Sequence, residues 1–551
     1  MKDFQSEHKM LEACRECVVI MRMAKRNGLT CSVTFTCNTP GCGFERTFKL
    51  YETVKENRRG PKRAVINKQF GHAVQDSTLG MHGACQFFAS LDLATLSASN
   101  CQRLASLVNK EMTHINDKDM QRLKCQRIRD NRACGLDVNR ERDVAISVDT
   151  RYNSTHFGDR KKLGISATQA VTTAVDSCNG YIIDFVMENR VCSQGSLSNN
   201  SREFCATGSK QHECSATVPV TENMNEGNMN KKLGERLLES GLVPVTVTSD
   251  NDGQGAKPYQ ALMRRGANGQ REVIAQSDPS HLANSQVRAV ENMTIHKEAF
   301  ACTKVKNATT LKKLLAKDIK YRSSIIVQQA RQLNLNDTQV TSLARAAVKC
   351  FCGDHQQCSK LAGSSCAEMP EKHWMLCSSL YRVAGVVHIN FNEQERRRIF
   401  EIFNIRLHSS ALNATRYGFD TQRNEAFNRA LSKNLPKNVV FKKNFLGRAS
   451  STVYRYNNGH SSVAAKLRQF GCPLKVGGVG MTRLNQQQHT IKQQRAYQIT
   501  ERYRKRRAMS RMKSAQEWFR RKTVQSNEHD YCKGQNDPYQ FEEMNDHGYC
   551  K

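Results

Sequence analysis

The chain has 551 residues, and its 84 lysines and arginines against 51 aspartates and glutamates give it a formal net charge of +33. Such an excess of positive charge predicts a polyanionic partner, nucleic acid before an acidic membrane. The sequence has no apolar run of about 18 residues, so we expect no membrane span. The N-terminal residues lack the apolar segment of a signal peptide, which predicts an intracellular protein. In a reducing compartment the 22 cysteines favour bound zinc over disulfides, with unliganded buried thiols as the alternative.

Residues 1–60 predict a zinc-ribbon-like module. Cys14 and Cys17 form one closely spaced pair, and Cys37 and Cys42 form a second. The alternating sequence between the pairs is typical of a strand. Structural zinc takes four thiolates or imidazoles at tetrahedral corners, and two such pairs supply them. We therefore expect these four cysteines to bind Zn²⁺, with a reduced cysteine-rich hairpin as the alternative.

Residues 61–142 predict a helical lead-in domain. The densely charged part, residues 116–142, is interpreted as a solvated helix or a linker. Apolar side chains before it are expected to form a core. These are Phe70, Phe87, Phe88, Leu91, Leu93 and Leu96.

Residues 143–285 predict the first part of an α/β core, which begins with three strands. The apolar, β-branched run 144–149 is typical of a buried strand that ends on a carboxylate, Asp149. Two more strands are expected over 163–175 and 181–187. The Asn-Gly dipeptide between them is a strong hairpin signal.

A helix, a strand, a helix and a further strand are expected next. The first of these strands ends at Asp250, with Asp252 in the following glycine-rich turn as the alternative acid. Both aspartates also suit a turn or a helix N-cap. Glu425 lies on a predicted helix in residues 416–441, where an ordinary surface glutamate is the alternative. The expected ranges of the four elements are 227–240, 242–249, 256–264 and 271–276.

This mixed order resembles the ribonuclease H-like fold, in which metal-binding acids lie at the ends of the first and fourth strands and on a helix after the fifth. Acids from three distant segments would then meet. Carboxylates are the hard oxygen ligands that Mg²⁺ prefers. The residues between the fifth strand and the last acid, 286–415, are interpreted as a mostly helical insertion.

Two further Cys/His clusters predict structural zinc, with loose thiol-rich loops as the alternative. One lies in the loop after the third strand, and the other lies in the helical insertion. The first consists of Cys192, Cys205, His212 and Cys214, and the second of His355, Cys358 and Cys366 with either Cys350 or Cys352.

Residues 442–551 predict a basic helical tail with a polar, disordered end. Its dense clusters of positive charge are typical of phosphate contacts and of a nuclear-import signal, so we expect a nuclear protein. A solvated helix is the alternative. The residues expected to contact DNA are Arg504, Lys505, Arg506, Arg507, Arg520 and Arg521.

These motifs together resemble the Mutator-like DNA transposases, in particular the animal branch. The resemblance is carried by the order and spacing of several passages. They are residues 70–87, 148–152, 248–253 and 421–428, with Asp278-x-x-His281 before the insertion. Two passages depart from the family pattern. Asp149 is followed by Thr-Arg-Tyr where the family usually has Gly-Thr-Trp, and residues 249–252 are Ser-Asp-Asn-Asp where the family has Gly-Asp-Gly-Asp.

The resemblance implies a DDE transposase. In that reading Asp149 is shared by two Mg²⁺ or Mn²⁺ ions, Asp250 and Glu425 each complete one ion's site, and His281 orients the DNA backbone or the active site. The implied reaction is cleavage of transposon ends and joining of a 3′-OH to double-stranded target DNA, by a homodimer or larger assembly. A domesticated, inactive nuclear DNA-binding protein is the main alternative, and a nuclease or RNA-processing enzyme on the same fold is another.

Overall fold

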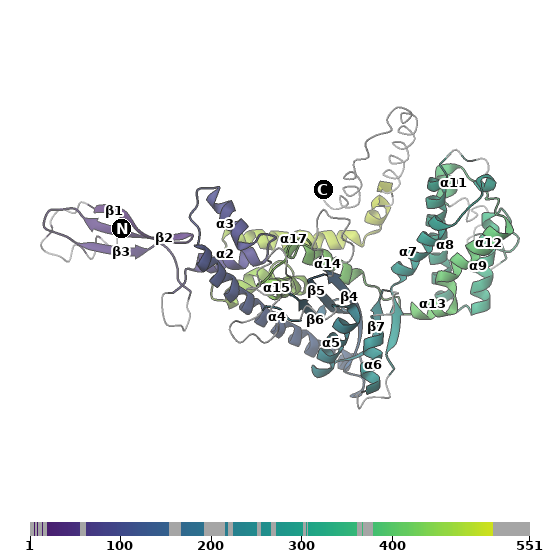
Figure 1. Cartoon of the computed structure of the whole chain (residues 1–551), viewed down its shortest axis with the longest axis horizontal. Helices are drawn as coiled ribbons and strands as arrows, with labels where there is room; N and C mark the ends of the chain where they lie inside the picture. The colour runs from purple at the N-terminus through teal and green to yellow at the C-terminus, as the bar shows by residue number, and fades with distance from the viewer. Residues whose placement is uncertain are drawn as a thin grey trace, which may run out of the picture. The chain divides into compact units, whose positions relative to one another are not determined.

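The structure is a computed structural model (Figure 1). By contacts the chain divides into two compact units, Met1–Asn485 and Gln486–Lys551, and each is described by itself. The residues that the structure describes are 5, 8, 14, 19–54, 62–153, 167–191, 215–218, 224–250, 255–265, 272–300, 303, 305, 307–360, 366, 378–507 and 509–510.

The N-terminal segment forms a small antiparallel sheet of three strands in the order β1-β2-β3. β1 is Val19–Asn27, β2 is Thr30–Cys37 and β3 is Glu45–Lys49. Gly28 turns the chain between β1 and β2 with a φ of +62°, a conformation that glycine adopts without steric cost. The predicted β-structure around the cysteine pairs is therefore present.

Helices follow, as predicted for the lead-in region. They are α2 (Val65–Gln75), α3 (Met81–Ala89) and α4 (Ala98–Ala133). The solvated interpretation of the charged segment is wrong for the part within α4, because one face of this helix packs against the central sheet and buries Met120, Leu123 and Lys124. Lys124 is buried since its ammonium group meets the buried carboxylate of Asp184 at 2.6 Å. Charge density alone does not reveal such a pairing.

The predicted core side chains of this region divide into two groups. Phe70 is buried, and Phe88 and Leu96 pack against the same apolar cluster. The prediction is wrong for Phe87, Leu91 and Leu93, which are exposed. These three residues lie at the end of α3 and in the turn after it, where the short helix has only one face against α4.

A five-stranded mixed sheet forms the centre of the first unit, in the order β6-β5-β4-β7-β8. β4 pairs antiparallel with β5 and parallel with β7, so the chain crosses from one side of β4 to the other between the third and fourth strands. The strands are β4 (Asp143–Tyr152), β5 (Gln169–Asp176), β6 (Ile182–Asn189), β7 (Val243–Ser249) and β8 (Ile274–Ser277).

The predicted strands agree with these five, with differences at the ends. β4 continues to Tyr152, so Asp149 lies inside the strand and not at its end. This happens because β5 offers hydrogen-bonding partners up to Ala170, opposite Tyr152. The hairpin between β5 and β6 turns at Gly180, whose φ is +78°. The predicted mixed α/β class is confirmed at the level of this sheet and its helices.

Helices cover both faces of the sheet (Figure 1). On one face, α5 (Glu226–Glu239) and α6 (Lys257–Arg265) pack on the apolar side chains Val144, Ile146 and Val148 of β4. On the other face, α14 (Gln422–Asn434) and α15 (Phe445–Asn458) share a cluster with β5, β6 and α4. The two faces of β4 are therefore distinct, and the residues alternating with its apolar side chains face α14.

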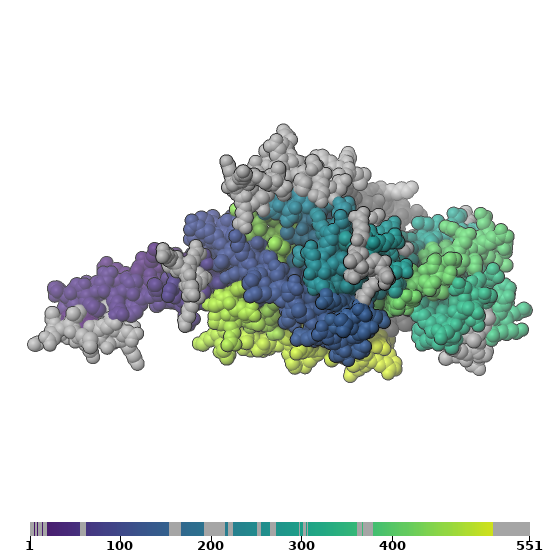
Figure 2. Space-filling model, turned by 90° about the horizontal axis from the view of Figure 1, so that it is seen from below, coloured from purple at the N-terminus to yellow at the C-terminus, as the bar shows by residue number. Residues whose placement is uncertain are grey.

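The sheet's packing continues past residue 441, where the predicted core ends. Phe445, Ala449 and Val453 of α15 are buried in the same cluster as Phe427 and Leu431 of α14. α15 also packs against α4, and Figure 2 shows the segment that carries it beside the lead-in helices. The sequence pattern predicted a helical, basic region here but did not show that the apolar face of α15 completes the core.

The segment between β8 and α14 is helical, as predicted for the insertion. Its elements are α7 (Pro279–Asn292), a short 3-10 helix (Lys297–Phe300), α8 (Ala308–Gln332), α9 (Asp337–Phe351), α11 (Ser379–Ala384), α12 (Glu393–Leu407) and α13 (Ser409–Ala414). Two more helices, α16 (Ser462–Gln469) and α17 (Val479–Gln498), follow α15. Across the described residues, none of these helices is apolar over enough length to cross a bilayer.

Candidate active site and metal centres

The neighbouring parallel strands β4 and β7 bring two acids to one edge of the sheet. Ser147 of β4 pairs with Thr248 of β7. Asp149 and Asp250 each follow two residues later. Because side chains alternate along a strand, this equal spacing aligns the two aspartates on the same face. The carboxyl edge of parallel strands is where open α/β sheets place their ligand sites.

His281 lies between two carboxylates at this edge. It belongs to the first turn of α7, which begins directly after β8. Its Nε2 lies 3.0 Å from Asp250 Oδ1 and 3.8 Å from Glu425 Oε1. All three side chains are partly exposed, between 35 and 40%, so the group is open to solvent and to a ligand.

Glu425 comes from α14, which is held on the sheet by asparagine side chains. Asn424 is fully buried, accepts from Ser147 Oγ at 2.6 Å and donates to the Ser147 carbonyl at 3.1 Å. One turn later, Asn428 donates from Nδ2 to Asp149 Oδ2 at 2.7 Å. Asn424 and Asn428 lie one turn apart on the side of the helix that faces β4 and hold the helix there, and Glu425 is one turn from Asn428. The structure brings Asp149, Asp250, Glu425 and His281 into one site, while their catalytic role stays a prediction.

The surroundings of Asp149 raise the pKa of its carboxyl group. Burial, followed by the negative charge of Asp250, raises the pKa of Asp149 to about 6. Glu425 contributes in the same direction, against hydrogen bonds from Thr150 and Asn428 that favour the anion. Three carboxylates at one site, all with hard oxygen donors, suit the binding of divalent cations. The alternative acid Asp252 lies outside the described residues, so the choice between it and Asp250 is untested.

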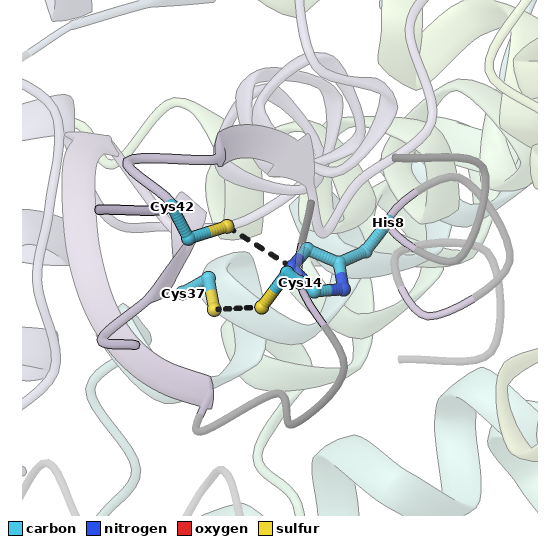
Figure 3. Close-up of side chains that lie close together, drawn as sticks. All are labelled: His8, Cys14, Cys37 and Cys42. Carbon is cyan, nitrogen blue, oxygen red and sulfur yellow. Dashed lines mark hydrogen bonds between the residues drawn. The ribbon is translucent and has the colours of Figure 1, made fainter. Parts of the chain in front are cut away.

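The N-terminal cluster contains a ligand that sequence reasoning missed. His8, Cys14, Cys37 and Cys42 bring one nitrogen and three sulfur atoms within 4.8 Å of one another (Figure 3). His8 Nε2 lies 3.2 Å from Cys42 Sγ, and the Sγ atoms of Cys14 and Cys37 lie 3.7 Å apart. The predicted ligand Cys17 lies outside the described residues.

One nitrogen and three sulfurs are a donor set typical of structural zinc. A hydrogen bond with the Thr39 side chain outweighs burial and lowers the pKa of Cys37 to about 6, which favours the thiolate form that a metal binds. The available sequence signal was that His8 is the one histidine among residues 1–60. Ligand spacing does not indicate this histidine, because it lies outside the closely spaced cysteine pairs.

A second cluster lies in the helical insertion. Cys350, His355, Cys358 and Cys366 also bring four ligand atoms within 4.8 Å of one another. The sequence left open whether Cys350 or Cys352 is the fourth member of this cluster, and the structure places Cys350 there. Cys350 is at the end of α9 and fully buried, and its Sγ lies 4.0 Å from that of Cys366. Both clusters are candidate zinc sites.

The remaining predicted ligands and DNA contacts are only partly described. The loop cluster, Cys192, Cys205, His212 and Cys214, lies outside the described residues, as do Arg520 and Arg521. In the second unit, Arg504 to Arg507 are helical and solvent-exposed. Lys505 forms an ion pair with Glu501 in the same helix, at 2.8 Å. Exposure leaves the basic groups accessible, and their role as phosphate contacts stays a prediction.

Comparison with known proteins identifies the family. A family model described as "Mutator-like transposase" matches residues 1–366. That range includes the N-terminal cluster, the five strands of the central sheet, His281 and the insertion cluster. No curated protein and no solved structure matches the chain.

Proposed function

Because the chain belongs to the Mutator-like transposase family, we propose that it is a DNA transposase, in which Asp149, Asp250 and Glu425 form the catalytic carboxylate site. The single observation that carries the proposal is that these three acids, from segments far apart in the sequence, lie together at the carboxyl edge of the sheet, where His281 contacts Asp250 and Glu425. The strand order supports assigning the core to the ribonuclease H-like fold. Mg²⁺ is the cofactor that the donor set fits, with Mn²⁺ as its usual substitute.

Bound divalent cations would supply the positive charge that activates an attacking oxygen and stabilises the leaving oxygen at phosphorus. The protein's part is to hold the acids. Asp149 lies on the rigid central strand β4, where Asn428 fixes one of its oxygens. Asp250 and Glu425 come from opposite sides, and His281 Nε2 spans the space between them. His281 therefore orients both carboxylates, and we assign it that role.

The substrate follows from charge and family. A net charge of +33 favours binding to DNA, and the exposed basic residues Arg504 to Arg507 supply phosphate contacts and a signal for nuclear import. Two DNA ends must be held together for transfer, which favours at least a homodimer. The two Cys/His clusters would each hold a structural Zn²⁺.

The test is strand transfer by the purified full chain, with labelled duplex carrying the terminal DNA of the element and either Mg²⁺ or Mn²⁺. Wild type is compared with Asp149→Asn, Asp250→Asn and Glu425→Gln. We expect each substitution to lower cleavage and joining by at least about 100-fold, because second-shell changes alone cost up to that much in metal sites. The matched control is Glu401→Gln, which removes an exposed carboxylate from α12.

The outcomes separate the rival functions. Joined product from wild type and from Glu401→Gln, lost in the three site variants, supports the transposase. Cleavage without joining would place the protein among nucleases. Salt-sensitive DNA binding without any metal-dependent product from wild type would leave an inactive, domesticated DNA-binding protein.

A further inference from the structure

A cavity of about 410 Å³ lies between helices α7, α8 and α12 of the first unit. Pro279 and Leu282 of α7 line one side, and Arg331 of α8, Arg406 of α12 and Thr415 line the others. Because a water molecule occupies about 30 Å³, a cavity of this volume is large enough for a phosphate group with its attached sugar.

The cavity is positively charged. Arg406 is almost fully buried, and its Nη1 donates to the Lys320 carbonyl and to Ser324 Oγ, both at 3.0 Å. Burial, and after it the positive charge of Arg331, lower the pKa of Arg406 to about 10. Burial and the charge of Arg406 likewise lower the pKa of Lys320. Arg406 is thus repelled by the positive charges of both Arg331 and Lys320. None of the described residues that line the cavity is acidic.

Arg331 retains donors for a ligand. Its Nη2 donates to the carbonyl and the hydroxyl oxygen of Thr415, which holds the guanidinium at the cavity wall. Within the described part of the chain, its hydrogen bonds come from Nη2 alone. A guanidinium group carries five N–H donors in a fork that matches phosphate oxygens.

We propose that this cavity binds a phosphate group of the nucleic-acid backbone, held between the guanidinium groups of Arg331 and Arg406. An anion there would relieve the repulsion between the two arginines, and a phosphodiester supplies both the charge and the acceptor oxygens. The inference rests on the proposed function, since it takes DNA as the source of the phosphate.

The cavity is well placed relative to the candidate active site. The first turn of α7 carries both, because His281 faces Asp250 while Pro279 and Leu282 line the cavity. His281 and Leu282 are consecutive residues, so the carboxylates and the cavity lie against neighbouring faces of one helical turn. A backbone phosphate held there would set the register of the same strand at the acids.

The experiment measures the affinity of the full chain for a duplex over a range of salt concentrations. The test variant is Arg331→Gln, and Arg331→Lys keeps the charge. The matched control is Arg397→Gln, which removes one exposed arginine from α12, away from the cavity. We expect Arg331→Gln to weaken binding about tenfold and to reduce the slope of log K against log salt by about 0.9. Arg331→Lys should keep the slope, and Arg397→Gln should match wild type.

A second arm separates DNA phosphate from free phosphate. The melting temperature is measured with and without inorganic phosphate at constant ionic strength. If phosphate stabilises wild type but not Arg331→Gln, while both bind duplex equally, the cavity serves a free anion and the proposal is overturned. Equal duplex binding and equal slopes for Arg331→Gln and Arg397→Gln would also overturn it. Failure of wild type to bind any duplex would instead overturn the proposed function.

Discussion

Asp278 accepts a hydrogen bond of 3.0 Å from the backbone amide of Thr421, although 143 residues separate the two in the chain. The same carboxylate accepts from the Thr421 hydroxyl and from the amide of Ser280. Asp278 is the N-cap of α7, which carries His281, and Thr421 is the N-cap of α14, which carries Glu425. One fully buried carboxylate therefore ties together the starts of the two helices that bring these side chains to the candidate site.

This contact predicts that Asp278→Ala impairs cleavage more than DNA binding. The change removes the buried carboxylate that links the starts of α7 and α14, and a displacement of about 1 Å at a reacting centre can lower a rate by about 100-fold. We also expect a loss of roughly 1–3 kcal/mol in the free energy of unfolding, because buried donors lose their acceptor. The rate at saturating DNA and the affinity are measured separately. Glu401→Ala, which removes an exposed carboxylate from α12, should leave the cleavage rate as in wild type. A pure affinity defect in Asp278→Ala would contradict the prediction.

Asn428 is predicted to position Asp149. Asn428→Ala removes the 2.7 Å hydrogen bond to Asp149 Oδ2, and outer-shell partners of metal ligands are typically worth 10- to 100-fold, so we expect cleavage to fall by about that factor. Titration with Mg²⁺ should show a higher half-saturating concentration. Lys433→Ala, an exposed position in the last turn of the same helix, serves as the control. Equal Mg²⁺ titrations for Asn428→Ala and Lys433→Ala would rule out this role.

Zinc content should distinguish Cys350 from Cys352. Cys350 belongs to the four-ligand cluster of the insertion, whereas Cys352 does not. Cys350→Ser is expected to lower the bound zinc by one equivalent per chain and to destabilise the insertion, because structural zinc contributes directly to folding. Elemental analysis of dialysed protein checks this. Cys352→Ser should retain the wild-type content.

The same comparison applies at the N-terminal cluster, with His8→Ala as the test and Cys31→Ser as the control. Cys31 lies on β2 but outside the cluster. Wild-type zinc content in His8→Ala would show that another residue completes that site.

The buried pair of Lys124 and Asp184 predicts a large effect on stability. The ammonium and carboxylate groups lie 2.6 Å apart and are at most 4% exposed. Removing one partner of a buried pair costs about 3–5 kcal/mol, and we expect Lys124→Met to lie near the low end because Arg236 also contacts Asp184 at 2.9 Å. Urea unfolding measures the change. Arg122→Met on the same helix breaks a pair whose arginine is 54% exposed and should cost less than about 1 kcal/mol.

The lowered pKa of Asp76 predicts that the stability of the fold depends on pH in the acidic range. Burial raises the pKa of Asp76, but Lys466 and hydrogen bonds from Lys466 and Ser451 lower it more, so the net pKa lies below its usual value. The unfolded pKa is about 3.9. The carboxylate therefore stabilises the fold above about pH 4, and this contribution is lost as the pH falls through the folded pKa. The stability difference between wild type and Asp76→Asn should shrink as the pH is lowered from 7 to about 3. Asp92→Asn, at an exposed position, should show no such trend.

Much of the fold followed from local sequence. The apolar, β-branched run of β4, the Asn-Gly turn before β6 and the carboxylate after β7 each depend on residues close together in the chain, so pattern and turn chemistry predicted them. The same holds for the helix that carries Glu425. The spacing of Cys37 and Cys42, and of His355 and Cys358, likewise indicated parts of the two candidate zinc sites.

Tertiary structure alone decided which distant groups meet. His8 joins the N-terminal cluster, Cys350 is chosen over Cys352, and Asn428 reaches Asp149 because separate elements converge in space. The apolar face of α15 completes the core of the sheet, although the surrounding sequence is strongly basic. Periodicity reports which side of an element is apolar and not what it packs against. The partner is set by chain topology and by the hydrogen bonds that buried polar groups require.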